Sequence, residues 1–178
     1  MFTKLGCAAM ALLAAASAVH SAEPGTPPVP KAVSNLKGCW EGRGEVMGKP
    51  VTIGVSAKLI VQDAILALDV KSQAVADPKD VYSAHLIFGG TNKKSGAASG
   101  QVVGYWSDSF GGAFATSGQG ETWPDGFDMT YHYTDDAFVN HWRFLSDGIV
   151  WRIIARDGKG VEKPFASYSL HKASCRAA

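Results

Sequence analysis

Two histidines are the side chains of this sequence best suited to metal or acid–base chemistry. His132 and His141 lie on neighbouring β-type segments, where diagonal neighbours on one face of a sheet stand about 7 Å apart between backbones. Two imidazoles hold a metal ion weakly, because a proper site needs three or four ligands. The pattern offers no third ligand, so we favour solvated surface histidines over a metal site and predict no metal and no cofactor.

A row of charged side chains is the second candidate for chemistry. Asp128, Arg143 and Arg152 are expected to lie side by side on one sheet face with Phe165. Two adjacent arginines could bind an anion, but an ion pair with a guanidinium stacked on the phenyl ring explains the row without a ligand, and we favour it. Asp108 opens a turn, in which an aspartate bonds the backbone two residues on. No catalytic residue is predicted.

Composition and motifs exclude several classes of function. The chain has 178 residues with 17 basic and 16 acidic side chains, a formal charge of +1, which is not the basic footprint of a nucleic-acid binder. It contains no phosphate-binding glycine loop, no catalytic serine elbow and no zinc-binding helix. Its 20 glycines and 10% aromatic residues favour an all-β domain.

The elements that must position these side chains are short β-type runs. From Gly38 onward such runs alternate with turn signals, and no helical period is found. Connections this short require antiparallel neighbours in chain order. Ten strands would leave two bare edges unless the sheet closes, so the sequence predicts a single ten-stranded antiparallel up-and-down barrel. The runs are 39–47, 51–61, 64–72, 81–88, 101–107, 112–120, 127–133, 138–145, 149–156 and 164–172.

Parity along the last four runs sorts their side chains into two faces. Two-residue turns are expected at 135–136 and 147–148, and a four-residue loop at 157–160. A register slip of one residue would invert every face. With these turns the aromatic side chains other than Phe165 point inward, and the charged side chains point outward. The expected pairs are Tyr133 with Phe138, Phe144 with Trp151, and Trp151 with Ala166.

The cysteines Cys39 and Cys175 stand at the start of the first strand and just past the end of the last. Those strands are neighbours in a closed barrel, and an exported protein with two cysteines so placed is expected to join them in a disulfide. A loop of more than a hundred residues gives about 4–5 kcal/mol of stabilisation in the chain-entropy model. The alternative is two free thiols.

The N-terminus has the pattern of a secretory signal peptide. Residues 1–22 carry Lys4, then an apolar run too short to span a membrane, then small residues that place cleavage in the window 18–22. A buried N-terminal helix is the alternative. Residues 23–34 are proline-rich and predict a disordered tether. The barrel domain is assigned to 35–175, and the protein is expected to be periplasmic or secreted, without a membrane span.

The opening of the first strand resembles a known superfamily. Leu36-Lys-Gly38-Cys-Trp40-Glu-Gly42 is similar to the Gly-x-Trp start of calycins, among them lipocalins and fatty-acid-binding proteins. The stretches 104–111, 118–120 and 125–127 resemble a family of uncharacterised bacterial calycin-like domains without a settled function. The resemblance covers residues 35–172.

Two departures from related barrels limit what the resemblance implies. Fatty-acid-binding proteins carry a helical lid after the first strand, whereas only Gly48-Lys-Pro50 follows it here. Nitrobindin-like haem barrels place an axial histidine near the start of the last strand, where this chain has Pro164 and Phe165, so haem is not expected.

These features predict a small-molecule-binding barrel. Aromatic walls with a few neutral hydrogen-bonding groups suit a largely apolar, uncharged ligand. The alternative is a structural or protein-interaction barrel filled by its own side chains, and the third hypothesis is an enzyme that uses residues at the cavity mouth. Outward apolar residues within 139–154 suggest weak self-association. The predicted ligand-lining residues are Trp40, Tyr131, Asn140, Trp142, Trp151 and Tyr168.

Overall fold

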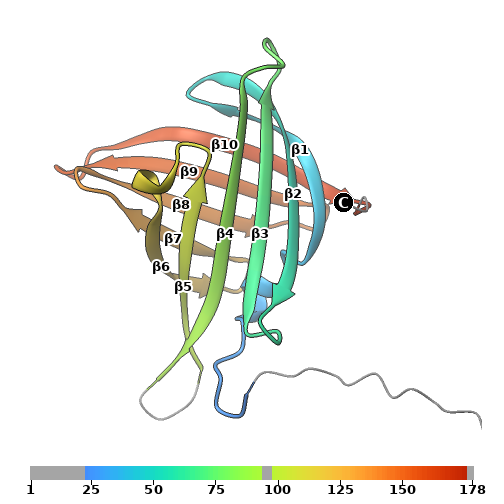
Figure 1. Ribbon diagram of the computed structural model, residues 1–178, viewed down its shortest axis with the longest axis vertical. Coiled ribbons are helices and arrows are strands. Elements are labelled where there is room, and N and C mark those ends of the chain that lie inside the picture. Colours follow the sequence, from blue (N-terminus) through green and yellow to red (C-terminus); the bar gives the residue numbers. More distant parts are fainter. Residues whose placement is uncertain (1–22, 94–97, 176–178) are drawn as a thin grey trace, which may run out of the picture.

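The computed structural model describes residues 23–93 and 98–175, whose strands form a closed antiparallel barrel (Figure 1). The strands follow chain order around the barrel, and β1 closes it by pairing with β10. The predicted ten-stranded up-and-down barrel is confirmed, whereas the predicted signal peptide, 1–22, lies outside the described residues. The elements are α1 (Lys31–Ser34), β1 (Gly38–Val46), β2 (Lys49–Ile60), β3 (Ile65–Ala74), β4 (Val81–Asn92), β5 (Ala98–Asp108), η1 (Gly112–Phe114), β6 (Thr116–Trp123), β7 (Gly126–His132), β8 (Asp136–Phe144), β9 (Ile149–Asp157) and β10 (Glu162–Ala173).

Short connections account for the antiparallel order. β1 and β2 are joined by Met47 and Gly48, which both have positive φ, at 49° and 77°. A two-residue hairpin turn of the type that matches strand twist requires positive φ at both positions, and glycine takes it without strain. One predicted run is only partly a strand: the 3₁₀ turn η1 occupies its first residues, and β6 begins at Thr116.

The strand faces follow the prediction, but the cross-strand partners do not. All three predicted pairings are displaced by two residues, partly because the β8–β9 connection takes the four residues 145–148 instead of two. A displacement of two keeps every side chain on its face, so the aromatic residues still point inward. The observed pairs are Tyr131 with Phe138, Trp142 with Trp151, Trp151 with Tyr168 and Ile153 with Ala166.

A bulge in β10 overturns one outward assignment. The β9–β10 register shifts between Pro164 and Ala166. Proline is tolerated at a bulge because it has no backbone N–H to donate and the strand ladder is interrupted there. The shift brings Phe165 against the hydrophobic core, with its ring 4.9 Å from that of Phe138. The predicted stacking of an arginine on Phe165 in the outer row is therefore wrong.

Helix α1 closes one end of the barrel. It lies against β6 and β7, and Val33 and Leu36 are fully buried in the core. Burying two aliphatic side chains contributes about 3–6 kcal/mol. The packed domain therefore begins before residue 35, and the last part of the predicted 23–34 tether is folded.

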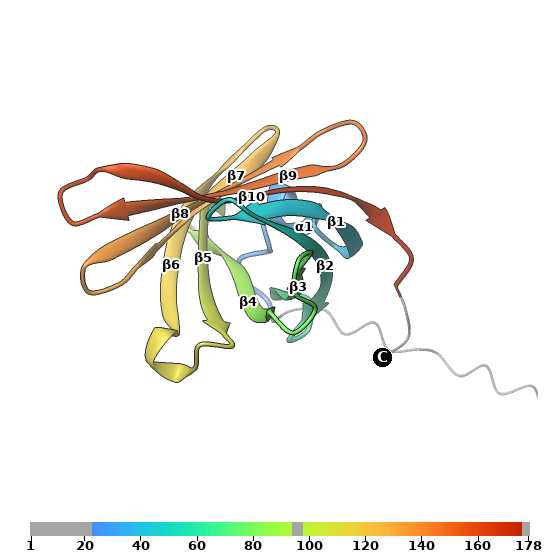
Figure 2. The same ribbon diagram turned by 90° about the horizontal axis from the view of Figure 1, so that it is seen from above.

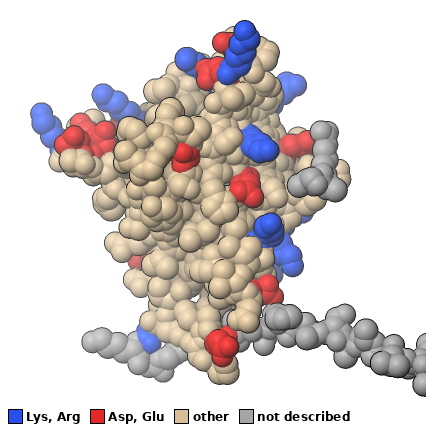
Figure 3. Space-filling view, viewed as in Figure 1, with Lys and Arg blue, Asp and Glu red and all other residues tan. Residues whose placement is uncertain are grey.

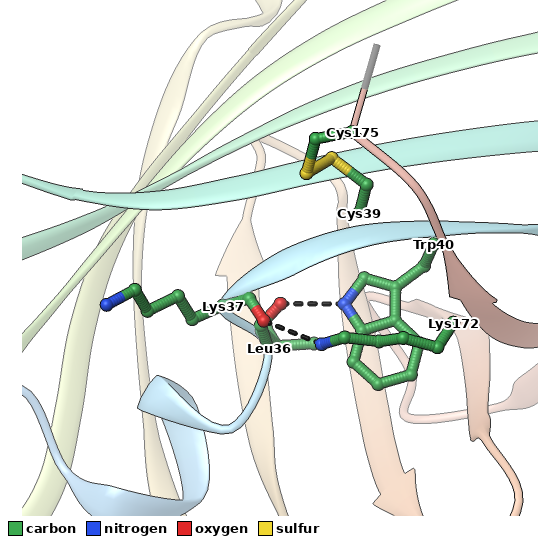
Figure 4. The surroundings of a disulfide bond; sticks show 6 residues. All are labelled: Leu36, Lys37, Cys39, Trp40, Lys172 and Cys175. Atoms are coloured by element: carbon green, nitrogen blue, oxygen red, sulfur yellow. Dashed lines mark hydrogen bonds between the residues drawn. A yellow bond between two sulfur atoms is a disulfide. The ribbon is translucent and has the colours of Figure 1, made fainter.

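The disulfide between Cys39 and Cys175 lies at the same end, where β1 meets β10 (Figure 4). Trp40 donates a hydrogen bond from Nε1 to the carbonyl of Leu36 at 2.7 Å. Lys172 places its Nζ 4.0 Å from the centre of the Trp40 ring and donates to the Lys37 carbonyl. The predicted disulfide is confirmed, and these contacts tie the helix, the first strand and the last strand together.

Stacked aromatic rings fill the middle of the barrel. The Phe127 and Trp142 rings stack at 5.8 Å, and Trp142 stacks on Trp151 at 4.2 Å. All three side chains are almost fully buried. The closed end of the barrel is therefore packed by α1 and by this stack, and the barrel interior opens toward the other end.

Candidate ligand-binding cavity

A cavity of about 710 Å³ occupies the end of the barrel opposite α1. Its wall is formed by inward side chains of β3, β4, β5 and β7 to β10, and its rim by the β1–β2 turn and the β5–β6 connection. Figure 2 views the molecule from this end. The volume falls within the range of small-molecule sites, about 300–1,000 Å³. The structure thus shows which end of the barrel is open, a point that the sequence did not decide.

Four of the six predicted lining residues lie in the cavity wall. Tyr131, Asn140, Trp151 and Tyr168 contribute to it. Trp142 has the predicted inward direction but lies in the packed stack below the cavity, and Trp40 packs at the disulfide end (Figure 4). Both residues therefore contribute to packing and not to the cavity wall. The sequence prediction included them because strand alternation identifies the inner face of the barrel but not the depth of a residue along the barrel axis.

The wall carries neutral hydrogen-bonding groups, one of which has no partner among the described residues. Trp151 donates from Nε1 to Oδ1 of the buried Asn140 at 2.9 Å. The hydroxyl of Tyr131, which is 1% exposed, has no hydrogen-bond partner. Burial raises the pKa of Tyr131 above its ordinary value and that of Tyr168 to about 12, so both hydroxyls keep their protons at neutral pH.

The mouth contains a carboxylate that the sequence interpretation treated only as a turn residue. Asp108 does bond its own backbone as predicted, since Oδ1 accepts from the Phe110 amide at 2.9 Å. Its Oδ2 also accepts from the Tyr82 hydroxyl and from Trp106 Nε1, each at 3.1 Å. All four residues line the cavity. The alternation of Trp106 and Asp108 along one strand was the available signal that both face inward.

Strand glycines make room for the tyrosines of the wall. A Cβ added at Gly118 would lie 2.5 Å from Cδ1 of Tyr131, and one at Gly44 would lie 2.6 Å from Cδ1 of Tyr168. Carbon atoms cannot approach so closely, so each ring occupies space that only glycine leaves free on the adjacent strand.

The predicted histidine pair does not form. His132 pairs with Ala137, whereas His141 pairs with Asp128 and places Nδ1 2.9 Å from its Oδ1. The two-residue register shift separates the histidines, and no group of three or more potential metal ligands occurs among residues 23–93 and 98–175. His132 is exposed, as expected of a surface residue.

The outer row is an ion-pair network. Asp128 accepts from Arg143 Nη1 at 2.7 Å, as predicted, and from Trp123 Nε1 at 3.1 Å. Partial burial acts to raise the pKa of Asp128, but the hydrogen bonds from Arg143 and His141 outweigh it and hold that pKa below its ordinary value. His141, not Arg143, lies between Asp128 and Arg152 in the register. Figure 3 shows basic and acidic side chains intermingled on the face in view.

Comparison with known proteins shows the fold alone. No protein-family model and no curated protein sequence matches the chain. The chain is similar to the crystal structure of Rv2717c from M. tuberculosis, with 17% sequence identity and a TM-score of 0.58, over 85% of this chain and 98% of that one. The two proteins therefore share a fold. Within the described residues, no helix has the length and apolar character needed to cross a membrane.

Proposed function

We propose that the protein is exported and binds a small, largely apolar ligand in the cavity. The observation that carries this proposal is a preformed space of about 710 Å³ with an aromatic wall, where a barrel of this size could have been filled by its own side chains. The Cys39–Cys175 bond supports export, because structural disulfides persist in oxidising compartments. Kinship with the uncharacterised bacterial calycin-like domains is part of the proposal.

Occlusion of the cavity tests the proposal. Ser72 is a buried polar residue of the wall, and its neighbour Lys71 points outward from the same strand. The neutral fluorophore N-phenyl-1-naphthylamine should bind the native protein at one site. Ser72→Leu fills the cavity and should weaken binding at least tenfold, whereas Lys71→Leu adds the same side chain outside and should not. Absence of binding to the native protein, or equal effects of the two variants, would contradict the proposal.

A ligand taken up in the cell would provide a second test. Native mass spectrometry of protein purified from its own host should show an added mass of a few hundred daltons that is lost on extraction with organic solvent. The same extraction applied to Ser72→Leu should yield none of this compound. Recovery of equal amounts from both proteins would place the compound outside the cavity.

Self-association through residues 139–154 remains a separate proposal. Val139 is only 6% exposed on the outer face, and its partners Thr130 and Ile154 are half-buried. Neighbouring side chains therefore already cover much of this apolar surface, so any dimer through it should be weak. Sedimentation equilibrium at high protein concentration measures it, and Val150→Lys should abolish the association if this face mediates it.

A further inference from the structure

The strongest chemical feature of the cavity mouth is the charge of Asp108. Three neutral donors fix its carboxylate: the Phe110 amide, the Tyr82 hydroxyl and Trp106 Nε1. Among the described residues it takes part in no salt bridge. A carboxylate held in one orientation without a protein cation is a ready partner for a positive group on a ligand.

Acidic side chains also outnumber basic ones among the other charged residues of the cavity. Asp80 and Asp136 also line the mouth, and Lys49 is the single basic residue among the described lining residues. Lys49 lies 3.9 Å from Asp80, and both side chains are more than half exposed. The ammonium of Lys49 therefore belongs to the rim. Two carboxylates, Asp108 and Asp136, have no basic partner within the described part of the chain.

Aromatic faces surround the carboxylate. The rings of Tyr82 and Phe110 are 5.8 Å apart, and Trp106 lies 5.4 Å from Tyr131. Burial and the nearby Asp108 charge raise the pKa of Tyr82 and also that of Tyr133, so both rings stay neutral and retain electron-rich faces. Such faces attract an organic cation within about 6 Å, and the attraction adds to that of the carboxylate.

A second polar group lies deeper in the wall. Tyr131 lines the cavity, and its hydroxyl oxygen is almost fully buried with no hydrogen-bond partner among the described residues. A buried hydroxyl without a hydrogen bond destabilises the protein, because its desolvation is not compensated. A polar atom on the inner part of a ligand would remove this destabilisation, so the hydroxyl points to a ligand that is polar at both ends.

We propose that the cavity selects an amphipathic organic cation, with its ammonium group at Asp108 among the mouth aromatic rings and an oxygen or nitrogen atom near the Tyr131 hydroxyl. This inference rests on the proposed function and changes one part of it, because the sequence alone suggested an uncharged ligand. The apolar body of the ligand lies against Trp151 and Tyr168, whose rings are 4.9 Å apart in the wall.

Three probes that share one naphthylmethyl body test the charge preference. They are (2-naphthylmethyl)trimethylammonium, neutral 2-naphthalenemethanol and anionic 2-naphthylacetate, each titrated by calorimetry into the native protein. The cation should bind at least tenfold more tightly than the alcohol, and the anion more weakly than both. The advantage of the cation should shrink in high salt, which screens the charges of the open mouth.

Variants locate the preference. Asp108→Asn removes the charge while keeping an oxygen acceptor, and it should reduce the advantage of the cation to less than threefold with little change for the alcohol. Asp136→Asn, at an exposed rim position, should reduce it about twofold without disturbing the fold. Asp147→Asn lies in the β8–β9 connection at the opposite end and is the matched control, which should bind as the native protein does.

The deep contact needs a probe with an inner hydroxyl. The 6-hydroxy derivative of the naphthyl cation should bind the native protein several-fold more tightly than the plain cation, and Tyr131→Phe should remove that gain.

The outcomes separate the two proposals. Binding of the alcohol with no preference for the cation would overturn the charge selection and leave the apolar cavity standing. A cation preference that survives in Asp108→Asn, with the Asp136→Asn protein also unchanged, would likewise overturn it. Failure of all three probes would overturn the charge selection and count against the proposed function as well.

Discussion

The disulfide should supply a large share of the stability of the barrel. The perturbation is the double variant Cys39→Ser with Cys175→Ser, which removes a cross-link between residues 136 apart. In the chain-entropy model, a closed loop of this length restricts the unfolded chain by about 5 kcal/mol at 25 °C. This is comparable to the whole stability of many domains, about 5–15 kcal/mol, so the variant should unfold at much lower urea concentrations.

Urea denaturation, followed by tryptophan fluorescence and far-ultraviolet circular dichroism, measures the loss. A decrease of about 5 kcal/mol in a domain of this size lowers Tm by about 10–20 °C. Ser174→Ala, next to Cys175, keeps the bond and is the control. A double variant within about 1 kcal/mol of the native protein would refute the reasoning. It would mean that the eight residue pairs between β1 and β10 keep the first and last strands together without a cross-link.

Three further results are expected from urea denaturation. Gly118→Ala should destabilise the protein by about 1–3 kcal/mol by displacing the Tyr131 ring, whereas Gly112→Ala, where an added Cβ meets nothing within 4 Å, should have little effect; equal losses would contradict the steric argument. Tyr131→Phe should stabilise the ligand-free protein by about 1 kcal/mol because it removes an unpartnered buried hydroxyl, and a loss of stability would reveal a partner for that hydroxyl. Asp128→Asn should destabilise by about 1 kcal/mol at pH 7. Since the folded pKa of Asp128 lies below its unfolded value, this difference should shrink as the pH falls from about 4 through the folded pKa, and a constant difference would contradict the linkage.

The barrel and its faces could be predicted from sequence because they depend on local patterns. Alternation places Tyr131 and Trp151 inward whatever their partners are, and short turns force antiparallel neighbours. Cross-strand partners depend on where each strand ends, and a turn at 147–148 looks like a two-residue hairpin although the structure uses four. Register errors of two residues are therefore invisible to parity. They misplaced the histidine pair and the outer row but not the aromatic interior.

Depth along the barrel axis is the property that the sequence could not supply. Trp142 and Trp151 follow the same inward pattern and stack on each other, yet Trp151 also lines the cavity and Trp142 does not. The difference arises from how the strands are staggered around the barrel and from α1, which fills the opposite end. The mouth residues were missed for a related reason. Phe165 faces inward only because of the β10 bulge, and Phe110 and Phe114 lie in a connection with no periodic pattern.

The two ends of the barrel differ in packing: one has the side-chain-filled interior of the first leading sequence hypothesis, and the other has the open space that the second, a ligand-binding barrel, requires. At the α1 end, Val33, Leu36 and the Phe127–Trp142 stack pack the barrel interior, and the disulfide holds the first and last strands together. At the other end, the same strands continue past the packed core and enclose the cavity. A rigid base keeps these strand ends apart, so the aromatic side chains of the mouth do not have to collapse onto one another. The cross-link and the packed base therefore help to keep the cavity preformed, and under the proposed function a preformed cavity lowers the ordering cost of binding.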